Sequence, residues 1–376
     1  MADTFADLPD ALVRDLLAKA MPVAESVSAD LKSLREARAR LCEDAKKQGL
    51  VCRKADLEVT REPSVVAVDG SYQIHRLTAL DLCAAAAVAV EGTSKEATRH
   101  WPEPYHSMWV DGLPHRIDSV GALRGLMVSM EMSLASQAPH DLVLLDGSFS
   151  SLIIYLNQAL TKLDDCAKTL ADEFLNRWNG GTLRQLKSLL NSDRTVAMPK
   201  FTSRNELLRG NMLTLPVAVD GKTLATMILN PGEYIRPLPI HDDSDPSSQQ
   251  VDHLPAAYCP AKDMDELVAA LKSLRVIYFR PYGWLPALRM ELPSSIACSN
   301  TRLAMVLEGI TRQLFSPAVI EPYPLFLADR MVKSLGSGVA VIEQVVAQHV
   351  AGDTPDVENT LLFLQNYRTE GGRGGV

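Results

Sequence analysis

The sequence feature that most constrains the fold is a short apolar run ending in Asp-Gly-Ser, which occurs twice. The first copy covers residues 65–71 (VVAVDGS) and the second covers residues 142–148 (LVLLDGS). A short apolar run followed by a turn signal is typical of a strand that is buried on both faces. Because Asp-Gly favours a sharp turn, each copy predicts a strand that ends at its carboxylate. The repeat therefore predicts that Asp69 and Asp146 lie together at one edge of a sheet.

A lone Asp-Gly more often marks a simple turn or the cap of the next helix. Here the pattern occurs twice, and a further acid, Glu131, lies between the copies. Glu131 falls within a predicted helix over residues 119–138, one position away from the apolar face of that helix. We therefore favour a shared acidic site over two unrelated turns.

The overall composition is that of a soluble globular protein. With 376 residues, 47% of them hydrophobic, the chain can form one large domain or two of ordinary size. The formal net charge of -8 argues against a generally basic surface for nucleic acids. It leaves room for a local basic groove around an acidic, metal-loaded centre, so a nuclease is not excluded.

The cysteines and the N-terminus indicate the cellular compartment. The six cysteines are scattered without a C-x-x-C pair, and there is no His-rich cluster, so neither a zinc site nor a disulfide framework is expected. Residues 1–7 carry acids where a secretory signal carries basic residues, and no apolar run is long enough to span a bilayer. We expect a cytoplasmic protein with reduced thiols that does not associate with membranes.

Periodicity predicts helices at both ends of the chain and strands between them. Apolar residues at helical spacing over residues 8–49 predict one or two amphipathic helices, packed on their own domain or on a second copy. Predicted strands over residues 79–90 and 105–110 follow the first strand closely, which favours an antiparallel meander. The remaining predicted elements are helices over residues 151–178, 300–315 and 324–350, and strands over residues 195–198, 224–229, 276–279 and 288–292.

Some of these segments carry additional signals. Residues 179–181 (NGG) are expected to end the helix before them. Alternation over residues 288–292 predicts a half-exposed strand in which Arg289 and Glu291 share one side and form a structural ion pair. Polar residues 241–252 predict a surface loop, and residues 370–375 predict a flexible tail.

Several carboxylates on separate elements are what phosphodiester hydrolysis by two metal ions requires. Such sites hold divalent ions about 3.5–4 Å apart, which activate water and stabilise the leaving oxygen. Two strands would supply Asp69 and Asp146, the helix between them Glu131, and the last helical region Asp329. Because ligands that are all oxygen favour magnesium or manganese over zinc, the pattern predicts a Mn²⁺ or Mg²⁺ site.

The predicted order of elements is that of a ribonuclease-H-like fold: three antiparallel strands, a helix, a parallel strand, then further helices and strands. The sequence also resembles the NurA family of DNA-end-processing nucleases over roughly residues 63–345. The resemblance rests on residues 68–71 (VDGS), 130–132 (MEM), 145–148 (LDGS), 199–203 (PKFTS), 289–293 (RMELP) and 322–324 (PYP), in that order.

The resemblance implies an α/β fold with a ribonuclease-H-like mixed sheet flanked by helices and an N-terminal helical extension. The extension would cover residues 1–60, and the nuclease domain with its insertions residues 61–350. Residues 351–376 would form a C-terminal segment with a flexible tail.

The resemblance also implies a set of catalytic residues. These are Asp69, Glu131, Asp146, Lys200 and Asp329, and the four acids would bind the metal ions. Asp329 is aligned by its distance from the Tyr-Pro pair before it, and the alternative is an acid that only favours the helix dipole. Lys200 would contact the scissile phosphate or orient the attacking water, and the alternative is an ordinary surface lysine.

Five further residues are predicted to contact DNA: Ser71, Ser148, Arg204, Tyr282 and Trp284. Arg204 would bind the DNA backbone. Tyr282 and Trp284 would stack on splayed bases, although aromatic residues beside a proline more often serve packing.

NurA nucleases typically act as homodimers docked on a hexameric HerA-type ATPase that pumps duplex DNA into the nuclease. This chain has no G-x-x-x-x-G-K-[ST] phosphate loop, so ATP-driven translocation would come from another subunit. The resemblance thus implies a divalent-metal-dependent DNA nuclease, exonuclease or endonuclease, that trims 5′-to-3′ in DNA repair or anti-phage defence.

Two other function classes are alternatives. One is a non-catalytic subunit that caps or regulates a ring ATPase. The other is a haloacid-dehalogenase-like phosphatase, which is disfavoured because neither strand end carries Asp-x-Asp.

Overall fold

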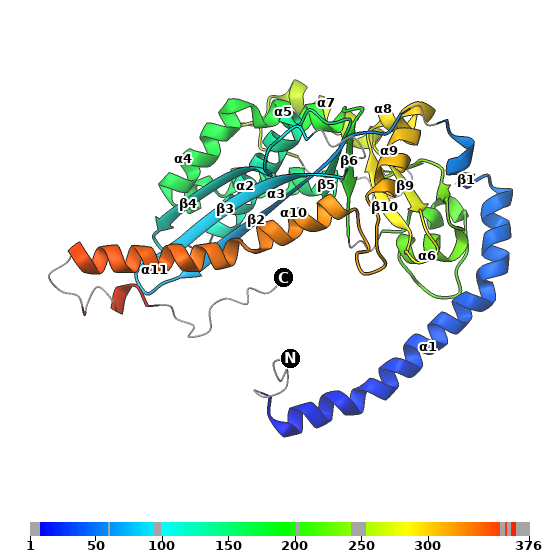
Figure 1. Cartoon of the computed structure of the whole chain (residues 1–376), viewed down its shortest axis with the longest axis horizontal. Coiled ribbons are helices and arrows are strands. Elements are labelled where there is room, and N and C mark those ends of the chain that lie inside the picture. The colour runs from blue at the N-terminus through cyan, green and yellow to red at the C-terminus, as the bar shows by residue number, and fades with distance from the viewer. Residues whose placement is uncertain are drawn as a thin grey trace.

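The centre of the protein is a mixed β-sheet with helices on both faces (Figure 1). A computed structural model describes residues 8–58, 61–93, 99–116, 118–200, 204–241, 253–353, 358 and 362–365. The strands are β1 (Val51–Arg53), β2 (Val65–Arg76), β3 (Asp81–Glu91), β4 (Tyr105–Leu113), β5 (Leu142–Asp146), β6 (Thr195–Met198), β7 (Glu233–Ile235), β8 (Leu238–Pro239), β9 (Arg275–Arg280) and β10 (Leu288–Leu292). Their order in the sheet is β1-β7-β9-β10-β6-β5-β2-β3-β4, and β8 pairs with β9.

Helices precede the first strand, follow the last one and lie in several of the connections between strands. The α-helices are α1 (Asp10–Lys47), α2 (Ser119–Gln137), α3 (Phe149–Thr161), α4 (Lys168–Arg177), α5 (Leu183–Leu190), α6 (Gly221–Ile228), α7 (Ala261–Ser273), α8 (Ser294–Ala297), α9 (Asn300–Arg312), α10 (Tyr323–Lys333) and α11 (Leu335–Asp353). Four other short helical segments are η1 (Lys54–Asp56), η2 (Leu163–Asp165), η3 (Trp178–Thr182) and η4 (Glu206–Asn211). The predicted loop beyond residue 241 and the predicted tail over residues 370–375 lie outside the described residues.

Five neighbouring strands have the predicted ribonuclease-H-like topology. β2, β3 and β4 form an antiparallel meander, α2 follows, β5 returns parallel to β2, and β6 lies parallel to β5. Val68 of β2 is the register partner of Leu145 of β5, so the aspartates that follow these two residues lie side by side. The predicted α/β fold, with a mixed sheet flanked by helices and an N-terminal helix, is confirmed.

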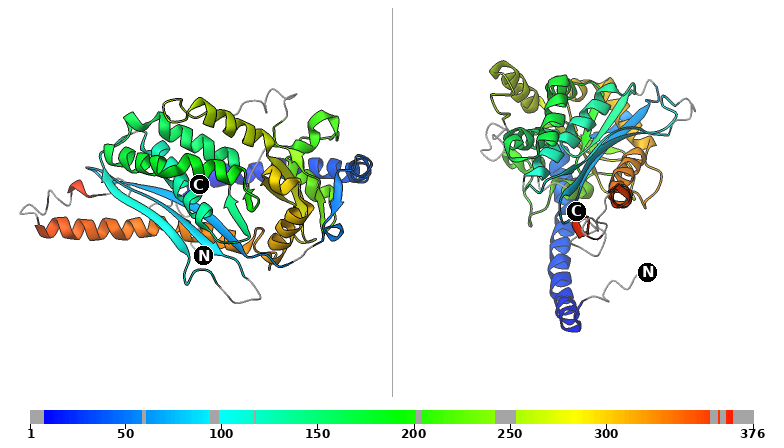
Figure 2. Two further views of the ribbon diagram at one scale, coloured as in Figure 1. Left: turned by 90° about the horizontal axis from the view of Figure 1, so that it is seen from above. Right: turned by 90° about the vertical axis from the view of Figure 1, so that its left-hand side faces the viewer.

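Each face of the sheet has its own hydrophobic core, because successive side chains of a strand point to opposite faces. On β2, Val66 and Val68 belong to the core beneath α2, α3, α4 and α5. Val65 and Ala67 belong to the core beneath α8, α9 and α10. Figure 2 shows these two helical layers, green and orange, on opposite sides of the strands. By the same alternation, Asp69 faces the α10 side.

The first Asp-Gly-Ser does not end its strand, contrary to the prediction. β2 continues beside β3 as far as Arg76, so Asp69 lies within the strand. Gly70 serves close packing instead of a turn, because a Cβ at this position would collide with the Glu131 carboxylate and with Met127 of α2. The cross-strand pairing with β3, which the local Asp-Gly signal does not contain, carries the strand through this point.

The second Asp-Gly-Ser ends its strand as predicted. β5 ends at Asp146, and Gly147 has a φ of 91°, a conformation that L side chains rarely adopt. The Ser148 side chain then accepts a hydrogen bond from the backbone N–H of Ser151 and caps α3. The chain thus leaves β5 without covering the aspartate.

The prediction of one continuous helix over residues 151–178 is wrong. The segment divides into α3, η2 and α4, and residues 179–181 do not end the helical region, because η3 leads directly into α5. The kink falls at Gly181, whose φ is 121°. Leu163, Cys166 and Leu170 lie before, within and after the break between η2 and α4, and all three are buried. The apolar periodicity therefore continues across this break and does not reveal it.

The prediction of a strand over residues 224–229 is also wrong, because α6 occupies residues 221–228. A short apolar run cannot by itself distinguish a strand from a buried helix. The overlooked signal is Asp220, whose side chain accepts hydrogen bonds from the backbone N–H groups of Lys222 and Thr223 and caps the helix.

The strand over residues 288–292 is confirmed, but its predicted half-exposure is wrong. All five residues of β10 are buried, including Arg289 and Glu291. The two charges are tolerated inside because Arg289 pairs both with Glu291 and with Glu206 of η4.

The N-terminal segment forms a single long helix, α1, only part of which packs on the body. Leu34, Leu41 and Ala45 near its C-terminal end are buried. Its N-terminal part extends away from the sheet in both figures. The large apolar side chains that are exposed there are those of Leu12, Leu16, Leu17, Met21, Val23, Val27 and Leu31, together with Leu8 just before the helix. β1 then joins the sheet by pairing with β7.

The C-terminal helical region is also divided. The predicted helix over residues 324–350 forms α10 and α11, which are separated at Ser334. Within the described parts of the chain, no helix combines the length and the apolar character needed to cross a membrane.

Candidate metal centre

Three carboxylates from separate elements meet on the α10 side of the sheet. Asp69 comes from β2, Asp146 from the end of β5 and Asp329 from α10. Each offers one oxygen atom that lies within 4.8 Å of the other two. Asp69 is buried, and the other two are half-buried. The structure thus places the two predicted strand aspartates side by side and adds Asp329 to them.

Lys200 supplies a positive charge to this acid cluster. Its Nζ atom lies 2.8 Å from Asp146 Oδ2 and 3.0 Å from Asp329 Oδ1. The lysine follows β6, whose last residue, Met198, is the register partner of Asp146. The side chain is therefore part of the cluster and is not an ordinary surface lysine.

A further carboxylate, Glu321, is not among the residues predicted from the sequence. Its Oε2 atom lies 3.2 Å from Lys200 Nζ, yet this oxygen is buried and has no hydrogen-bond partner of adequate geometry. The only sequence signal is its position directly before the Pro-Tyr-Pro segment that starts α10. An acid at such a position is more often interpreted as a helix-dipole residue.

Glu131 approaches from the opposite face of β2. It is buried in α2, and its carboxylate lies against Gly70, where the missing Cβ leaves room for it. Burial raises the pKa of Glu131, and the negative charges of Asp69 and Asp146 raise it further. Glu131 thus adjoins the cluster without belonging to the three residues whose oxygens lie within 4.8 Å of one another.

The cluster carries more negative charge than its cations neutralise. Burial and the neighbouring Asp146 raise the pKa of Asp69 to about 7, against the opposing effect of Lys200. Burial alone would lower the pKa of Lys200, but the hydrogen bond to Asp146 raises it, so the ammonium group stays charged. Burial also opposes ionisation of Asp329, but Lys333 and Lys200 together hold its pKa below the usual range.

The residues present fit a hard divalent cation. The available ligands are carboxylate oxygens, the donor type preferred by Mg²⁺ and Mn²⁺. The buried Glu321 Oε2 without a hydrogen bond is a further oxygen that a cation or its water could satisfy. Asp69, Asp146 and Asp329 would hold the ion.

A buried polar network supports the turn after β5. Arg289 donates hydrogen bonds to Glu206 at 2.7 Å and to Glu291 at 2.6 Å, and Tyr278 donates its hydroxyl to Glu206. The other oxygen of Glu291 accepts the backbone N–H of Phe149 at 2.9 Å. Because Phe149 begins α3, the predicted ion pair of Arg289 and Glu291 fixes the backbone next to the metal centre.

Lys222 is another residue near the site that the sequence did not indicate. Its Nζ atom donates a hydrogen bond to the carbonyl oxygen of Lys200 at 2.9 Å. Burial lowers the pKa of Lys222. Lys222 lies just before the predicted strand over residues 224–229, and the helix α6 that carries it was not predicted.

The residues predicted to contact DNA lie in different structural environments. Ser148 caps α3, and Ser71 lies half-buried in β2 opposite Ala86 of β3. Arg204 is exposed and precedes η4. These placements neither require nor oppose contact with DNA, so the DNA-binding role of the three residues stays a prediction.

Tyr282 and Trp284 stack on each other in the loop between β9 and β10. Their ring centroids are 4.9 Å apart and the planes differ by 8°. Trp284 is 42% exposed, whereas the Tyr282 hydroxyl donates to the carbonyl of Thr311 at 3.3 Å. Since β10 pairs antiparallel with β6 through Glu291 and Ala197, this loop lies at the same edge of the sheet as Lys200.

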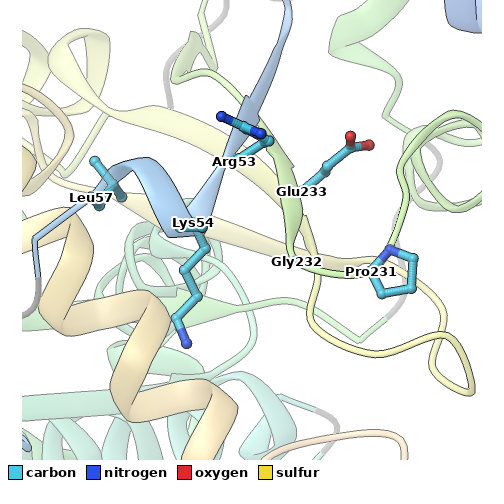
Figure 3. A pocket seen from close by; sticks show the side chains of 7 residues that line it. Arg53, Lys54, Leu57, Pro231, Gly232 and Glu233 are labelled. Carbon is cyan, nitrogen blue, oxygen red and sulfur yellow. The ribbon is translucent and has the colours of Figure 1, made fainter.

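A separate pocket of about 430 Å³ lies at the far edge of the sheet, between η1 and the start of β7 (Figure 3). Lys54 points away from Arg53 and Glu233 in this view. It pairs with Glu308 of α9 at 2.7 Å, so its charge is already matched. The pocket contains none of the residues of the acid cluster.

A comparison with protein families identifies the family of the chain. The family model of the NurA domain matches residues 63–334, which is more than half of the chain. The chain is a member of the NurA family. The matched region of this NurA protein includes every residue of the acid cluster as well as Lys200 and Glu321.

Solved NurA structures share the fold of this NurA protein. The NurA nuclease from Sulfolobus solfataricus gives a TM-score of 0.59 at 10% identity, over 93% of this chain and 99% of that chain. A NurA structure with manganese gives 0.50 at 11% identity, over 87% of this chain and 97% of that chain. No curated protein matches the chain significantly.

Proposed function

We propose that this NurA protein is a divalent-metal-dependent deoxyribonuclease. The observation that carries the proposal is the meeting of Asp69, Asp146 and Asp329, from three separate elements, with oxygens within 4.8 Å of one another. Convergent carboxylates on a dry, shaped surface are typical of enzymes that hydrolyse phosphodiesters with two metal ions.

The relatives support both the activity and the cofactor. The Sulfolobus solfataricus protein is a nuclease, and a second NurA structure contains manganese. Together with the oxygen-only ligand set, this supports Mn²⁺ or Mg²⁺ as the cofactor of this chain.

The residues of the site would have different roles in catalysis. Asp69, Asp146 and Asp329 hold the ions, and Glu131 supports them from the α2 face. When bound, the ions activate a water molecule and stabilise charge on the leaving oxygen. Lys200 remains protonated beside the same carboxylates and binds a phosphate oxygen or orients the water. Ser71, Ser148, Arg204, Tyr282 and Trp284 are the proposed DNA contacts.

We further propose that the protein works in the cytoplasm as a homodimer on a HerA-type hexameric ATPase, trimming DNA ends 5′-to-3′ in repair or anti-phage defence. The exposed apolar side chains of α1, which include Leu16 and Met21, support a second copy as its partner. The chain lacks a phosphate loop for ATP, which supports a separate motor subunit.

A manganese titration with linear duplex DNA tests the proposed activity. Purified protein should cleave the DNA only when the metal is present. Asp146→Asn should lower the cleavage rate by at least about 100-fold, as loss of a group that stabilises the transition state does. Asp172→Asn, an exposed change in α4, is the matched control and should cleave at the parent rate.

The same titration separates the enzyme from the alternative of a non-catalytic subunit of a ring ATPase. Such a subunit would neither bind manganese at the acid cluster nor cut DNA. Full cleavage by an Asp69→Ala/Asp146→Ala double variant would overturn the proposed site.

A further inference from the structure

A second group of potential metal ligands lies away from the acid cluster. Glu91 is the last residue of β3, His100 follows it along the chain, and His140 lies in the turn between α2 and β5. One atom from each of these side chains lies within 4.8 Å of those of the other two. The sequence offered no such signal, since the residues are not adjacent and no Cys or His motif is present.

The three side chains converge on one carboxylate oxygen. His140 Nε2 lies 2.7 Å from Glu91 Oε1, and His100 Nδ1 lies 3.1 Å from the same atom. The two imidazole centroids are 4.4 Å apart. The backbone N–H groups of His100 and Trp101 also donate to the Glu91 carboxylate, at 2.8 and 3.4 Å. Such secondary hydrogen bonds orient the carboxylate ligands of metal ions.

The protein satisfies only part of the hydrogen-bonding capacity of the His140 imidazole. The residue is only 2% exposed, and its Nδ1 atom is buried without a hydrogen-bond partner. Burial lowers its pKa, which favours the neutral imidazole that binds metals. The other ring nitrogen, Nε2, faces Glu91 and is the atom of His140 that would bind an ion in this cluster. The Trp101 ring, whose centroid lies 4.9 Å from that of the His140 ring, gives the cluster an apolar wall.

The location and the ligand chemistry separate this cluster from the acid centre. Glu91 is the register partner of Val66, which lies about 10 Å along β2 from Asp69 at the usual rise of a strand. Two imidazoles and one carboxylate form a set that suits zinc, whereas oxygen-only sets suit magnesium and manganese.

We propose that Glu91, His100 and His140 bind one zinc-class transition-metal ion, with the fourth ligand position open to solvent beside the exposed His100. The ion would tie the end of β3 and residues 100–101 to the turn that leads into β5. This site is independent of the proposed nuclease activity.

Metal binding by the full-length protein tests the proposal. The parent for the test carries Asp69→Asn and Asp146→Asn, which remove the acid centre as a competing site. After treatment with EDTA and incubation with Zn²⁺, this parent should retain one equivalent per chain by elemental analysis. Co²⁺ should give the intense visible absorption of a site of low coordination number, and Zn²⁺ should abolish that absorption.

Two further changes, each made in this parent, locate the ion. His100→Ala removes a partly exposed ligand, 38% accessible in its side chain, so folding should persist, and the zinc equivalent and the Co²⁺ absorption should both be lost. His106→Ala, an exposed histidine of β4, is the matched control and should retain both. Zinc should also raise the Tm of the parent and of the control, but not of the His100→Ala variant.

Either of two results would overturn the proposal. The parent could bind no zinc, in which case the three side chains form only a hydrogen-bonded charge cluster. Alternatively, the His100→Ala variant could retain as much zinc as the His106→Ala variant, in which case the ion lies elsewhere.

Discussion

At the residue scale, Asp69 is a carboxylate whose negative charge is disfavoured by its surroundings. Burial and Asp146 raise its pKa from 3.8 to about 7 in the metal-free protein. A group whose folded-state pKa is raised stabilises the fold below its unfolded pKa and loses that contribution as the pH rises through the folded value. Without a metal ion, Asp69 should therefore weaken the fold progressively between about pH 4 and pH 7.

This behaviour can be measured against Asp69→Asn, which is neutral at every pH. In EDTA, the free energy of unfolding of the unsubstituted protein, relative to that of the variant, should fall between pH 4 and pH 7 and level off above it. Urea denaturation at several pH values provides the measurement. A difference that does not change with pH would show that the Asp69 carboxylate is not held in the environment described.

Gly70 is needed because of its neighbour in α2. An added Cβ would collide with the Glu131 carboxylate and with Met127, so Gly70→Ala should destabilise the protein by about 1–3 kcal/mol, as overpacking does. Gly112→Ala in β4 is the control, since its Cβ would meet Leu80 at an ordinary 3.5 Å. Equal stabilities of the two variants in urea would contradict this packing.

At the scale of elements, β10 depends on the charges buried within it. Arg289 is 2% exposed and forms ion pairs with both Glu206 and Glu291. Arg289→Met would leave two buried carboxylates without their cation, which should cost about 3–5 kcal/mol. Arg53→Met breaks an exposed pair with Asp56 and should cost less than about 1 kcal/mol.

Adding Glu206→Gln and Glu291→Gln to Arg289→Met should restore part of the lost stability, since the uncompensated charges are then removed. Chemical denaturation of the single and triple variants measures both effects. A cost for Arg289→Met no larger than that for Arg53→Met would show that the network does not stabilise β10 or the turn after β5.

Elements were predictable where their signals are local. The Asp-Gly-Ser repeat led to β2 and β5, and parallel pairing of these strands brings Asp69 and Asp146 together. The same signal misplaced the end of β2, because pairing with β3 overrides the local preference of Asp-Gly. The short apolar run of α6 resembles a strand, so Lys222 was not connected with the site.

Contacts between distant segments were beyond the sequence patterns. Glu321 reaches Lys200 only because α10 packs against β2. Glu91 and His140 are separated by 49 positions, and strand pairing and the end of α2 bring them together. The scattered cysteines argued against a zinc motif, but they carried no information about histidines that meet in space.

At the scale of the whole molecule, the exposed part of α1 is the clearest apolar surface that the described residues leave uncovered. Leu16 and Met21 are 54% and 67% exposed, and Figure 1 shows their helix extending from the body. We expect the unsubstituted protein to be a dimer by analytical ultracentrifugation, and Leu16→Asp/Met21→Asp to be a monomer with an unchanged circular dichroism spectrum. This follows because a charge cannot be buried unpaired in an apolar interface.

The control for this experiment changes charged positions in the same part of α1. Asp15→Ala/Lys19→Ala should remain a dimer, since neither side chain belongs to the apolar set. An unsubstituted protein that sediments as a monomer, or a Leu16→Asp/Met21→Asp variant that stays dimeric, would rule out α1 as the dimer interface.

The most direct test of the metal centre is anomalous X-ray diffraction from crystals of the protein soaked in manganese. We predict anomalous peaks in contact with the carboxylates of Asp69, Asp146 and Asp329, from ions about 3.5–4 Å apart as in two-metal hydrolases. Crystals of Asp146→Asn should lose these peaks. Manganese that binds without contacting Asp69 or Asp146 would contradict the proposed centre.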